Sequence, residues 1–331
     1  MIHFQFVSET DIANRVSPRD GETKLGETLQ YVSSLDAIAS STAPYVIFGI
    51  EEDIGVRANY GKKGASKAWN AFLNAFIQVQ ANKHNVSQML LLGHIKVVPH
   101  ASIKAETPKS ELGDMVSRID KMVAQVVKII VAAGKIPIII GGGHNNAYGN
   151  LKGSSLALGK AVHAINIDAH TDLRTANYRH SGNGFRYAME DAEGPFLDKY
   201  SIFGLHKNYT PTYIFEWMDT QKNRIAYQLF EDMTTIDQTL DSFQSMVKTV
   251  HDGSFGLELD CDAIVNFPSS AQTPSGFDLN TTRTLVQLAG REKKCCYFHI
   301  CEAAPNKKNA GQVGKALSYL VTDFIRAHGT H

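Results

Sequence analysis

The stretch "DMVSRIDKMVAQVVKIIVAAGKIPIII" (Asp114–Ile140) joins two apolar patterns, and their order decides the fold class. In its first part, apolar residues recur three and four positions apart, which predicts an amphipathic helix over 113–133. Gly134 follows as a residue suited to end a helix. The short apolar run 135–140 then predicts a buried strand. We therefore expect a helix that leads directly into a strand.

The same alternation extends outward from this stretch in both directions. Apolar runs predict further strands at 44–50, 88–93, 161–167, 200–205, 224–230, 254–259 and 295–300. Helix-spaced apolar residues predict helices at 66–82, 238–251, 278–290 and 310–327. Alternating strands and helices are typical of a mostly parallel sheet with helices on both faces. Because no long Pro/Gly/Ser linker and no repeat interrupts the pattern, we expect one α/β domain over residues 1–331.

The composition fits a globular protein and excludes several classes of partner. Of 331 residues 43% are hydrophobic, and 33 basic residues balance 33 acidic ones, so nothing favours nucleic acid. No apolar run approaches the roughly 20 residues of a membrane span, and the N-terminus lacks the pattern of a secretory signal. The four cysteines lack a CxxC spacing, so we expect reduced thiols in a cytoplasmic protein and no cysteine-only zinc site. They are Cys261, Cys295, Cys296 and Cys301.

Three of the predicted strands lead into loops rich in metal-ligand residues. The run 135–140 is followed by "GGGHNNAYGN", 161–167 by "DAHTDLR" and 254–259 by "DCDAIVNF". The carboxyl ends of parallel strands share one edge of a sheet, so we expect these loops to meet there. Together they offer two imidazoles and four carboxylates: His144, Asp168, His170, Asp172, Asp260 and Asp262.

Four crowded carboxylates repel one another unless cations lie between them. An imidazole and carboxylate set without thiolate suits Mn²⁺ best, with Fe, Co, Ni or Zn as competitors. Six ligands exceed the need of one ion and suffice for two ions that share carboxylates. Each motif alone has an ordinary explanation, since Asp-x-Asp after a strand can form a turn and three glycines can form a tight bend. The three motifs together favour a dinuclear metal site.

These motifs resemble those of the arginase–agmatinase–formimidoylglutamase (ureohydrolase) family over nearly the whole chain. The matching segments, in the family's order, are "EEDIGVRANYGKKGASKAW", "GGGHNNAYGN", "DAHTDLR", "SGNGFRYAM", "LELDCDAI" and "HICEAAP". The resemblance implies a three-layer α/β/α fold with a dinuclear Mn²⁺ centre that hydrolyses C–N bonds of guanidines and amidines. Family members often form trimers or hexamers, so the resemblance also implies a homo-oligomer, although no segment identifies an interface.

The resemblance implies a role for each candidate ligand. It places His144 and Asp172 on one ion, His170 and Asp262 on the other, and Asp168 and Asp260 between the two. Glu302 in "HICEAAP" matches the glutamate that faces the amidinium group of the substrate; an ordinary ion pair at a strand end is the alternative. A hydroxide that bridges the ions would attack the amidine carbon, and Asp172 would carry a proton to the leaving amine.

Two departures from the family pattern affect what the resemblance implies. The family's loop is Gly-Gly-Asp-His, whereas here Gly143 precedes His144. In the family this aspartate supports the metal ligands without binding the metal itself. Because it is missing here, we expect a change in metal affinity or tuning. The third loop also lacks the family's Asp-Pro. Both of its ligand carboxylates are present, so the dinuclear expectation stands.

The segment "DLRTANYRHSGNGFRYAM" carries the substrate prediction. Arg174 stands where arginases have an asparagine that reads the α-carboxylate, and Ser181 and Asn183 match positions that bind the amino-acid end. Phe185 replaces the shuttle histidine of arginases, and Arg186 follows it. Because an arginine fork matches a carboxylate, we expect a dicarboxylate amidine as substrate. The alternative is that Arg174, Arg179 and Arg186 are solvated surface charges.

N-formimidoyl-L-glutamate fits this pocket, and its hydrolysis to L-glutamate and formamide is a step of histidine breakdown. A second hypothesis is a family hydrolase that acts on arginine, agmatine or a guanidino acid. Phe185 and Arg174 count against arginine, and an arginine-lined pocket should repel agmatine, which has no carboxylate. A third hypothesis is an inactive metal-binding relative with a scaffolding role, suggested by Gly143. The retention of all six ligands and of Glu302 counts against it.

Overall fold

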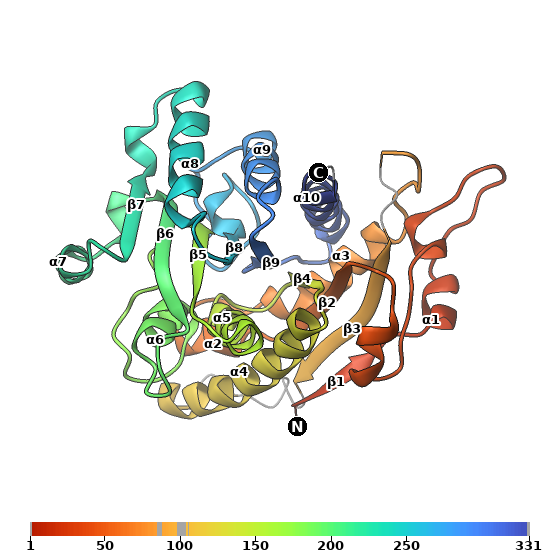
Figure 1. The fold of residues 1–331 in the computed structure, drawn as a ribbon, viewed down its shortest axis with the longest axis horizontal. Coiled ribbons are helices and arrows are strands. Elements are labelled where there is room, and N and C mark those ends of the chain that lie inside the picture. The colour runs from red at the N-terminus through yellow and green to blue at the C-terminus, as the bar shows by residue number, and fades with distance from the viewer. Residues whose placement is uncertain (1, 85–87, 98–103, 105, 330–331) are drawn as a thin grey trace.

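A central sheet of nine strands organises the computed structural model, which describes residues 2–84, 88–97, 104 and 106–329 (Figure 1). The strand order is β1-β3-β2-β4-β9-β8-β5-β6-β7. Among the described strands, β1 alone runs antiparallel to its neighbour, and every other pairing is parallel. The strands are β1 (Ile2–Phe6), β2 (Tyr45–Glu51), β3 (Met89–Val97), β4 (Ile136–Ile140), β5 (Val162–Ile167), β6 (Leu197–Leu205), β7 (Ile225–Leu229), β8 (Phe255–Asp260) and β9 (Cys295–Cys301).

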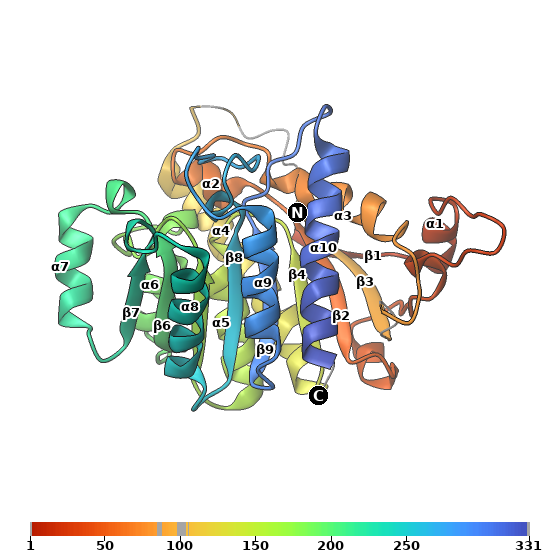
Figure 2. The same cartoon turned by 90° about the horizontal axis from the view of Figure 1, so that it is seen from above.

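Helices cover both faces of this sheet, as the alternating sequence pattern predicts (Figure 1). One face carries α3 (Ala68–Phe76), α8 (Ile236–Val250), α9 (Leu279–Gly290) and α10 (Ala310–Gly329), which lie in front of the strands in Figure 2. The other carries α4 (Lys109–Ala132), α5 (Asn146–Leu158), α6 (Gly184–Glu190) and α7 (Thr212–Thr220). Two short helices, α1 (Glu9–Ala13) and α2 (Ile54–Ala58), complete the described helices. The predicted three-layer α/β/α class is confirmed.

Each face has its own hydrophobic core. Trp69, Phe298 and Phe324 pack in the first, and Phe48 and Tyr200 pack in the second. Such close-packed cores hold the strands rigidly, so the loops at the strand ends are anchored on an immobile frame. No described helix combines the length and the apolarity that crossing a bilayer requires.

Helix α5 is absent from the sequence prediction for a physical reason. It contacts α4 through Gly149 and Gly153, where an added Cβ would lie 2.7 Å from the Val123 Cβ and 2.6 Å from the Ala124 carbonyl oxygen. The close approach of the two helices therefore requires small residues on the buried side of α5. Because those residues are not large and apolar, no helix-spaced hydrophobic pattern appears in the sequence.

Four neighbouring parallel strands bring the functional loops together. In the sheet they stand in the order β4-β9-β8-β5, so their carboxyl ends lie along one edge. The loop with His144 follows β4, the loop with Asp168 follows β5, and Asp260 ends β8. Asp260 and Cys301 are paired neighbours in register on β8 and β9. The sheet edge thus assembles residues more than 150 positions apart into one site.

Candidate metal centre

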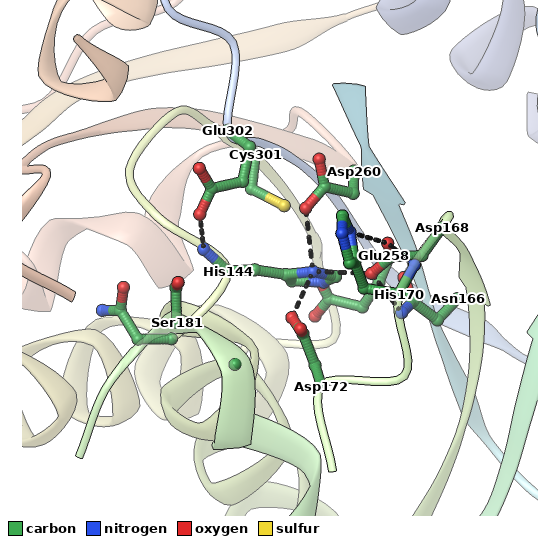
Figure 3. A network of polar contacts seen from close by, with 12 residues as sticks. His144, Asn166, Asp168, His170, Asp172, Ser181, Glu258, Asp260, Cys301 and Glu302 are labelled. Carbon is green, nitrogen blue, oxygen red and sulfur yellow. Dashed lines mark hydrogen bonds and ion pairs between the residues drawn. The ribbon is translucent and has the colours of Figure 1, made fainter. Parts of the chain in front are cut away.

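Five of the six predicted ligands form two clusters that overlap at Asp168, one with His144 and Asp172 and the other with His170 and Asp262. The sixth, Asp260, lies beside His144 (Figure 3). The Nδ1 of His144 is 2.9 Å from a carboxylate oxygen of Asp172, 3.1 Å from one of Asp168 and 3.3 Å from one of Asp260. The Nδ1 of His170 is 3.1 Å from Asp262 and 3.5 Å from Asp168. Asp168 belongs to both clusters, so its carboxylate lies between two potential ion positions.

Burial disfavours the negatively charged form of the carboxylates in this site. It raises the pKa of Asp262 to about 6, and burial followed by the charges of Asp262 and Asp168 raises the pKa of Asp260 well above its usual value. One oxygen of Asp262 is buried without a hydrogen-bond partner among the described residues, and the Nδ1 of His144 faces three carboxylates without a hydrogen bond of regular geometry. Divalent cations would remove both the repulsion and the unmet bonding capacity. The donor set therefore fits the dinuclear centre that the sequence predicts.

Hydrogen bonds orient the ligand carboxylates. Asp168 accepts from the backbone N–H of His170 at 2.6 Å and from the side-chain amide of Asn166 at 2.9 Å. Asp260 accepts from the backbone N–H of Asp262 at 2.9 Å. Asp172 has a φ of +49°, a conformation that a non-glycine residue adopts only when its surroundings impose it. The ligands are thus held in place by the strand ends themselves.

Glu302 also lies at this edge, directly after β9, with a φ of +60°. One of its oxygens accepts from the backbone N–H of His144 at 2.9 Å, and the other accepts from the hydroxyl of Ser270 at 3.0 Å. Its side chain is buried, so this is no surface ion pair. Burial and then the charge of Asp260 raise the pKa of Glu302 well above its usual value, which marks a site where a cationic group would be stabilised.

The structure accounts for Gly143, the departure from the family loop. A Cβ at this position would lie 2.6 Å from the Asn145 side-chain oxygen and 2.8 Å from a methyl group of Val56. The backbone N–H of Gly143 instead donates to the buried carboxylate of Glu52 at 2.9 Å. Glu52 thus supplies, from another loop, a carboxylate that holds this turn, and an aspartate at position 143 would require the side chains of Asn145 and Val56 to move.

A cavity of about 150 Å³ opens above the ligands. Its lining contains the acidic side chains of Asp172, Asp260 and Glu302 together with Arg174 and Ser181. The cavity therefore carries groups of both charges. A molecule with a cationic group at one end and a carboxylate at the other matches this arrangement.

The structure places the other predicted substrate residues outside the cavity lining. Asn183 is fully buried; its amide donates to the carbonyl oxygens of Tyr178 and Thr175 and so shapes the loop. Arg186 forms an ion pair with Glu190 at 2.8 Å and lies over the ring of Trp217. Since those contacts hold its guanidinium, Arg174 is the better placed of the two arginines to bind a substrate carboxylate.

Arg179 is a positioning residue that the sequence did not reveal. Its side chain is buried and forms a fork with Asp120 at 2.8 and 3.3 Å. It also donates to the Asn183 side-chain oxygen at 2.7 Å and lies between the rings of Tyr148 and Tyr187. Burial raises the pKa of Asp120 to about 6, while the Arg179 charge acts in the opposite direction. This pair ties the substrate loop to α4, so Arg179 is not a solvated charge.

We expect Arg179→Met to lower the free energy of unfolding by about 3–5 kcal/mol, because a buried carboxylate would lose its partner. Urea denaturation at pH 7.5 measures the change. Arg19→Met is the matched control, since Arg19 is exposed and its pair with Glu22 is long at 4.0 Å. The double variant Arg179→Met/Asp120→Leu should recover part of the loss. A change below about 1 kcal/mol in the single variant would contradict this role.

An aromatic stack supports His170, the most exposed of the six ligands. Tyr209 stacks on its ring at 5.2 Å, His206 stacks on Tyr209 at 5.3 Å, and Phe230 continues the column at 4.9 Å. The Tyr209 hydroxyl bonds to Thr273 at 3.1 Å. The column fixes the plane of the His170 ring. No local sequence pattern marks these residues, since they come from three separate loops.

Comparison with known proteins supports this arrangement. A family model described as the arginase family matches residues 43–326. A formimidoylglutamase of Lysinibacillus sphaericus is 29% identical over 312 residues, which cover 91% of this chain and 90% of the relative. The fold is also that of a Trypanosoma cruzi formiminoglutamase solved with Mn²⁺ (TM-score 0.75, 17% identity, 94% and 99% of the two chains). A Bacillus subtilis formimidoylglutamase gives the same TM-score at 14% identity, covering 94% and 93%.

Proposed function

Because this chain belongs to the arginase family, we propose that it hydrolyses N-formimidoyl-L-glutamate to L-glutamate and formamide. The observation that carries the proposal is a single cavity lined by Glu302, by ligand carboxylates and by Arg174. This charge pattern complements an amidinium group joined to a dicarboxylate. The formimidoylglutamases among its relatives support the same substrate.

The six clustered residues would hold two divalent cations, for which Mn²⁺ is the first candidate. His144 and Asp172 would hold one, His170 and Asp262 the other, and Asp168 and Asp260 would contact both. When bound, such ions lower the pKa of a water molecule and so make a nucleophile available at neutral pH. The manganese present in a structural relative supports this choice of metal.

Glu302 would bind the amidinium end of the substrate. Its two oxygens are already oriented by the His144 backbone and by Ser270, so the carboxylate is fixed before the substrate arrives. The amidinium group is positively charged before hydroxide adds, and the leaving nitrogen becomes positive again when it is protonated, so a fixed buried carboxylate can stabilise positive charge at both stages. Asp172 also lines the cavity, where it could carry a proton to the leaving amine.

Glu302→Gln tests this role with little change in shape. We expect kcat/KM to fall about 10²- to 10³-fold, because the amide cannot compensate the amidinium charge. Metal content, measured by elemental analysis, should stay at the wild-type value. Ser270→Ala is the matched comparison; it removes one hydrogen bond to Glu302 and should cost about tenfold or less. A Glu302→Gln enzyme within threefold of wild type would show that Glu302 does not face the reacting group.

Turnover by the manganese-loaded protein tests the function as a whole. N-formimidoyl-L-glutamate is assayed beside arginine, agmatine and guanidinobutyrate, with release of glutamate or urea followed. Glutamate from the first substrate alone is the expected result. Urea from another substrate would retain a family hydrolase and reject the dicarboxylate preference. Bound metal without turnover on any of the four would reject the proposed reaction and favour an inactive relative.

A further inference from the structure

A third group of ligand-type side chains lies deeper than the two clusters described above. His144, Asp260 and Cys301 are all buried, and they offer three ligand atoms within 4.8 Å of one another. The sulfur of Cys301 points toward the side on which His144 and Asp260 lie (Figure 3). The ligand set inferred from the sequence contained no sulfur, so this thiol is an addition that only the structure reveals.

The sheet fixes the position of this thiol. Cys301 is the last residue of β9, and Asp260, its register partner, is the last residue of β8. Paired residues on neighbouring strands direct their side chains to the same face. His144 follows β4, which is the neighbour of β9 on its other side. An imidazole, a thiol and a carboxylate therefore leave three adjacent strands at one level of the sheet.

The contacts of these side chains leave them available to a cation. Cys301 makes one weak hydrogen bond, to the Leu259 carbonyl oxygen at 3.6 Å between sulfur and oxygen. Both ring nitrogens of His144 are buried and make no hydrogen bond of regular geometry; Nδ1 faces the carboxylates of the metal site, and Nε2 lies 3.6 Å from Glu258. Buried nitrogen and sulfur atoms with such weak partners are typical of a site that a metal ion completes.

We propose that His144, Asp260 and Cys301 form a separate position for a thiophilic divalent cation such as Zn²⁺ or Cd²⁺, which competes with the dinuclear centre. The proposal rests on the metal assignment of the proposed function, because two of the three residues are shared with it. One imidazole, one carboxylate and one thiolate leave a fourth coordination position open, as zinc accepts. Thiolate ligands favour Zn²⁺ over Mn²⁺.

This position differs from the two manganese positions. The group that contains Cys301 includes neither Asp168 nor Asp172, and it shares His144 and Asp260 with the ligands proposed for manganese, so a cation held by the sulfur would compete for those two side chains. Cys301 does not line the cavity, whereas Asp260 does. A cation would thus enter past Asp260 and draw Asp260 and His144 away from the catalytic ions. The expected consequence is inhibition by zinc that depends on Cys301.

Cobalt(II) is the probe, because it reports sulfur coordination directly. Metal-free protein is titrated with Co²⁺, and the near-ultraviolet sulfur-to-cobalt charge-transfer absorption is recorded with the visible bands of bound cobalt. We expect the charge-transfer absorption in the wild type and its loss in both Cys301→Val and Cys301→Ser. Cys295→Val is the matched control, since Cys295 is also buried but begins β9 at its other end. It should retain the absorption.

The outcomes separate this inference from the proposed function. Cobalt bound without charge-transfer absorption overturns the Cys301 position and leaves the dinuclear centre intact. No bound cobalt at all overturns both. Retention of the absorption in Cys301→Val also rejects the inference, since another thiol would then be the ligand. Far-ultraviolet circular dichroism shows whether each variant is folded.

Zinc inhibition gives a second, independent measurement. Each manganese-loaded protein is titrated with Zn²⁺, and the half-inhibitory concentration is determined relative to its own uninhibited rate. We expect Cys301→Val to raise this concentration about tenfold or more, the range in which loss of one metal contact usually falls. The same half-inhibitory concentration in wild type and variant would overturn the competition.

Discussion

Replacing Asp168 with alanine should remove both metal ions and lower turnover by roughly 10³-fold or more. Asp168 is the one carboxylate that belongs both to the cluster with His144 and to the cluster with His170. Its oxygens lie 3.1 Å from the His144 ring nitrogen and 3.5 Å from that of His170. Its loss would leave Asp260 as the one remaining carboxylate proposed to contact both ions and would leave each ion with one ligand fewer. Metal content by elemental analysis and kcat/KM on N-formimidoyl-L-glutamate are the two measurements.

Two further variants make this result specific. Asp168→Asn keeps an acceptor for the His170 backbone N–H and so preserves the turn, yet it should still lose metal because the charge is absent. Asp198→Ala removes a carboxylate that is half exposed and lies next to His163 instead, and it should bind metal as the wild type does. Two ions per chain in either Asp168 variant would refute the bridging assignment.

Arg174→Ala should raise KM for the dicarboxylate about 10- to 100-fold and leave metal content unchanged. Arg174 lines the cavity wall, and its backbone N–H donates to the Gly182 carbonyl oxygen at 2.9 Å. This bond fixes the backbone from which the side chain reaches the cavity that Ser181 and Glu302 also line. Loss of a charge-assisted fork to a carboxylate costs about 1.5–3 kcal/mol, which corresponds to the expected change in KM.

The matched control for this effect is Arg186→Ala. Arg186 is an arginine of the same segment whose guanidinium is bound by Glu190 and Trp217, so its replacement should leave KM within about twofold. Arg174→Lys should fall between wild type and alanine, because lysine keeps the charge and loses the fork. If Arg174→Ala leaves KM as it is, another group binds the substrate carboxylate.

The sequence predicts well those elements whose pattern of apolar residues lies within one short segment of the chain. The apolar runs 135–140 and 254–259 correspond to β4 and β8, and the loops after them converge because parallel strands share an edge. The family membership, read from the same loops, is confirmed by the family model. The roles of individual ligands, the cytoplasmic location, the single domain and the homo-oligomer stay predictions.

The features that escaped prediction depend on contacts between distant segments. Cys301 ends an ordinary apolar strand, and only its register with Asp260 brings the thiol to the ligands. The burial of Arg179 depends on Asp120 in α4, 59 residues earlier in the chain. Strand β1 was missed because it is short and lies at the edge of the sheet, where one half of its surroundings is solvent. No pattern within a window of ten residues contains such information.

Within residues 174–183, the side chains that hold the loop differ from those that line the cavity. This difference affects how substrate preference could change over evolution. Arg179 and Asn183 form the buried frame of this loop, whereas Arg174 and Ser181 face the cavity. A substitution at a position that lines the cavity leaves the contacts of the frame in place and therefore carries a smaller folding penalty than one within the frame. Successive replacements at 174 and 181 could thus explore other amidines and guanidines without loss of the fold, while the positions of the frame would stay under constraint.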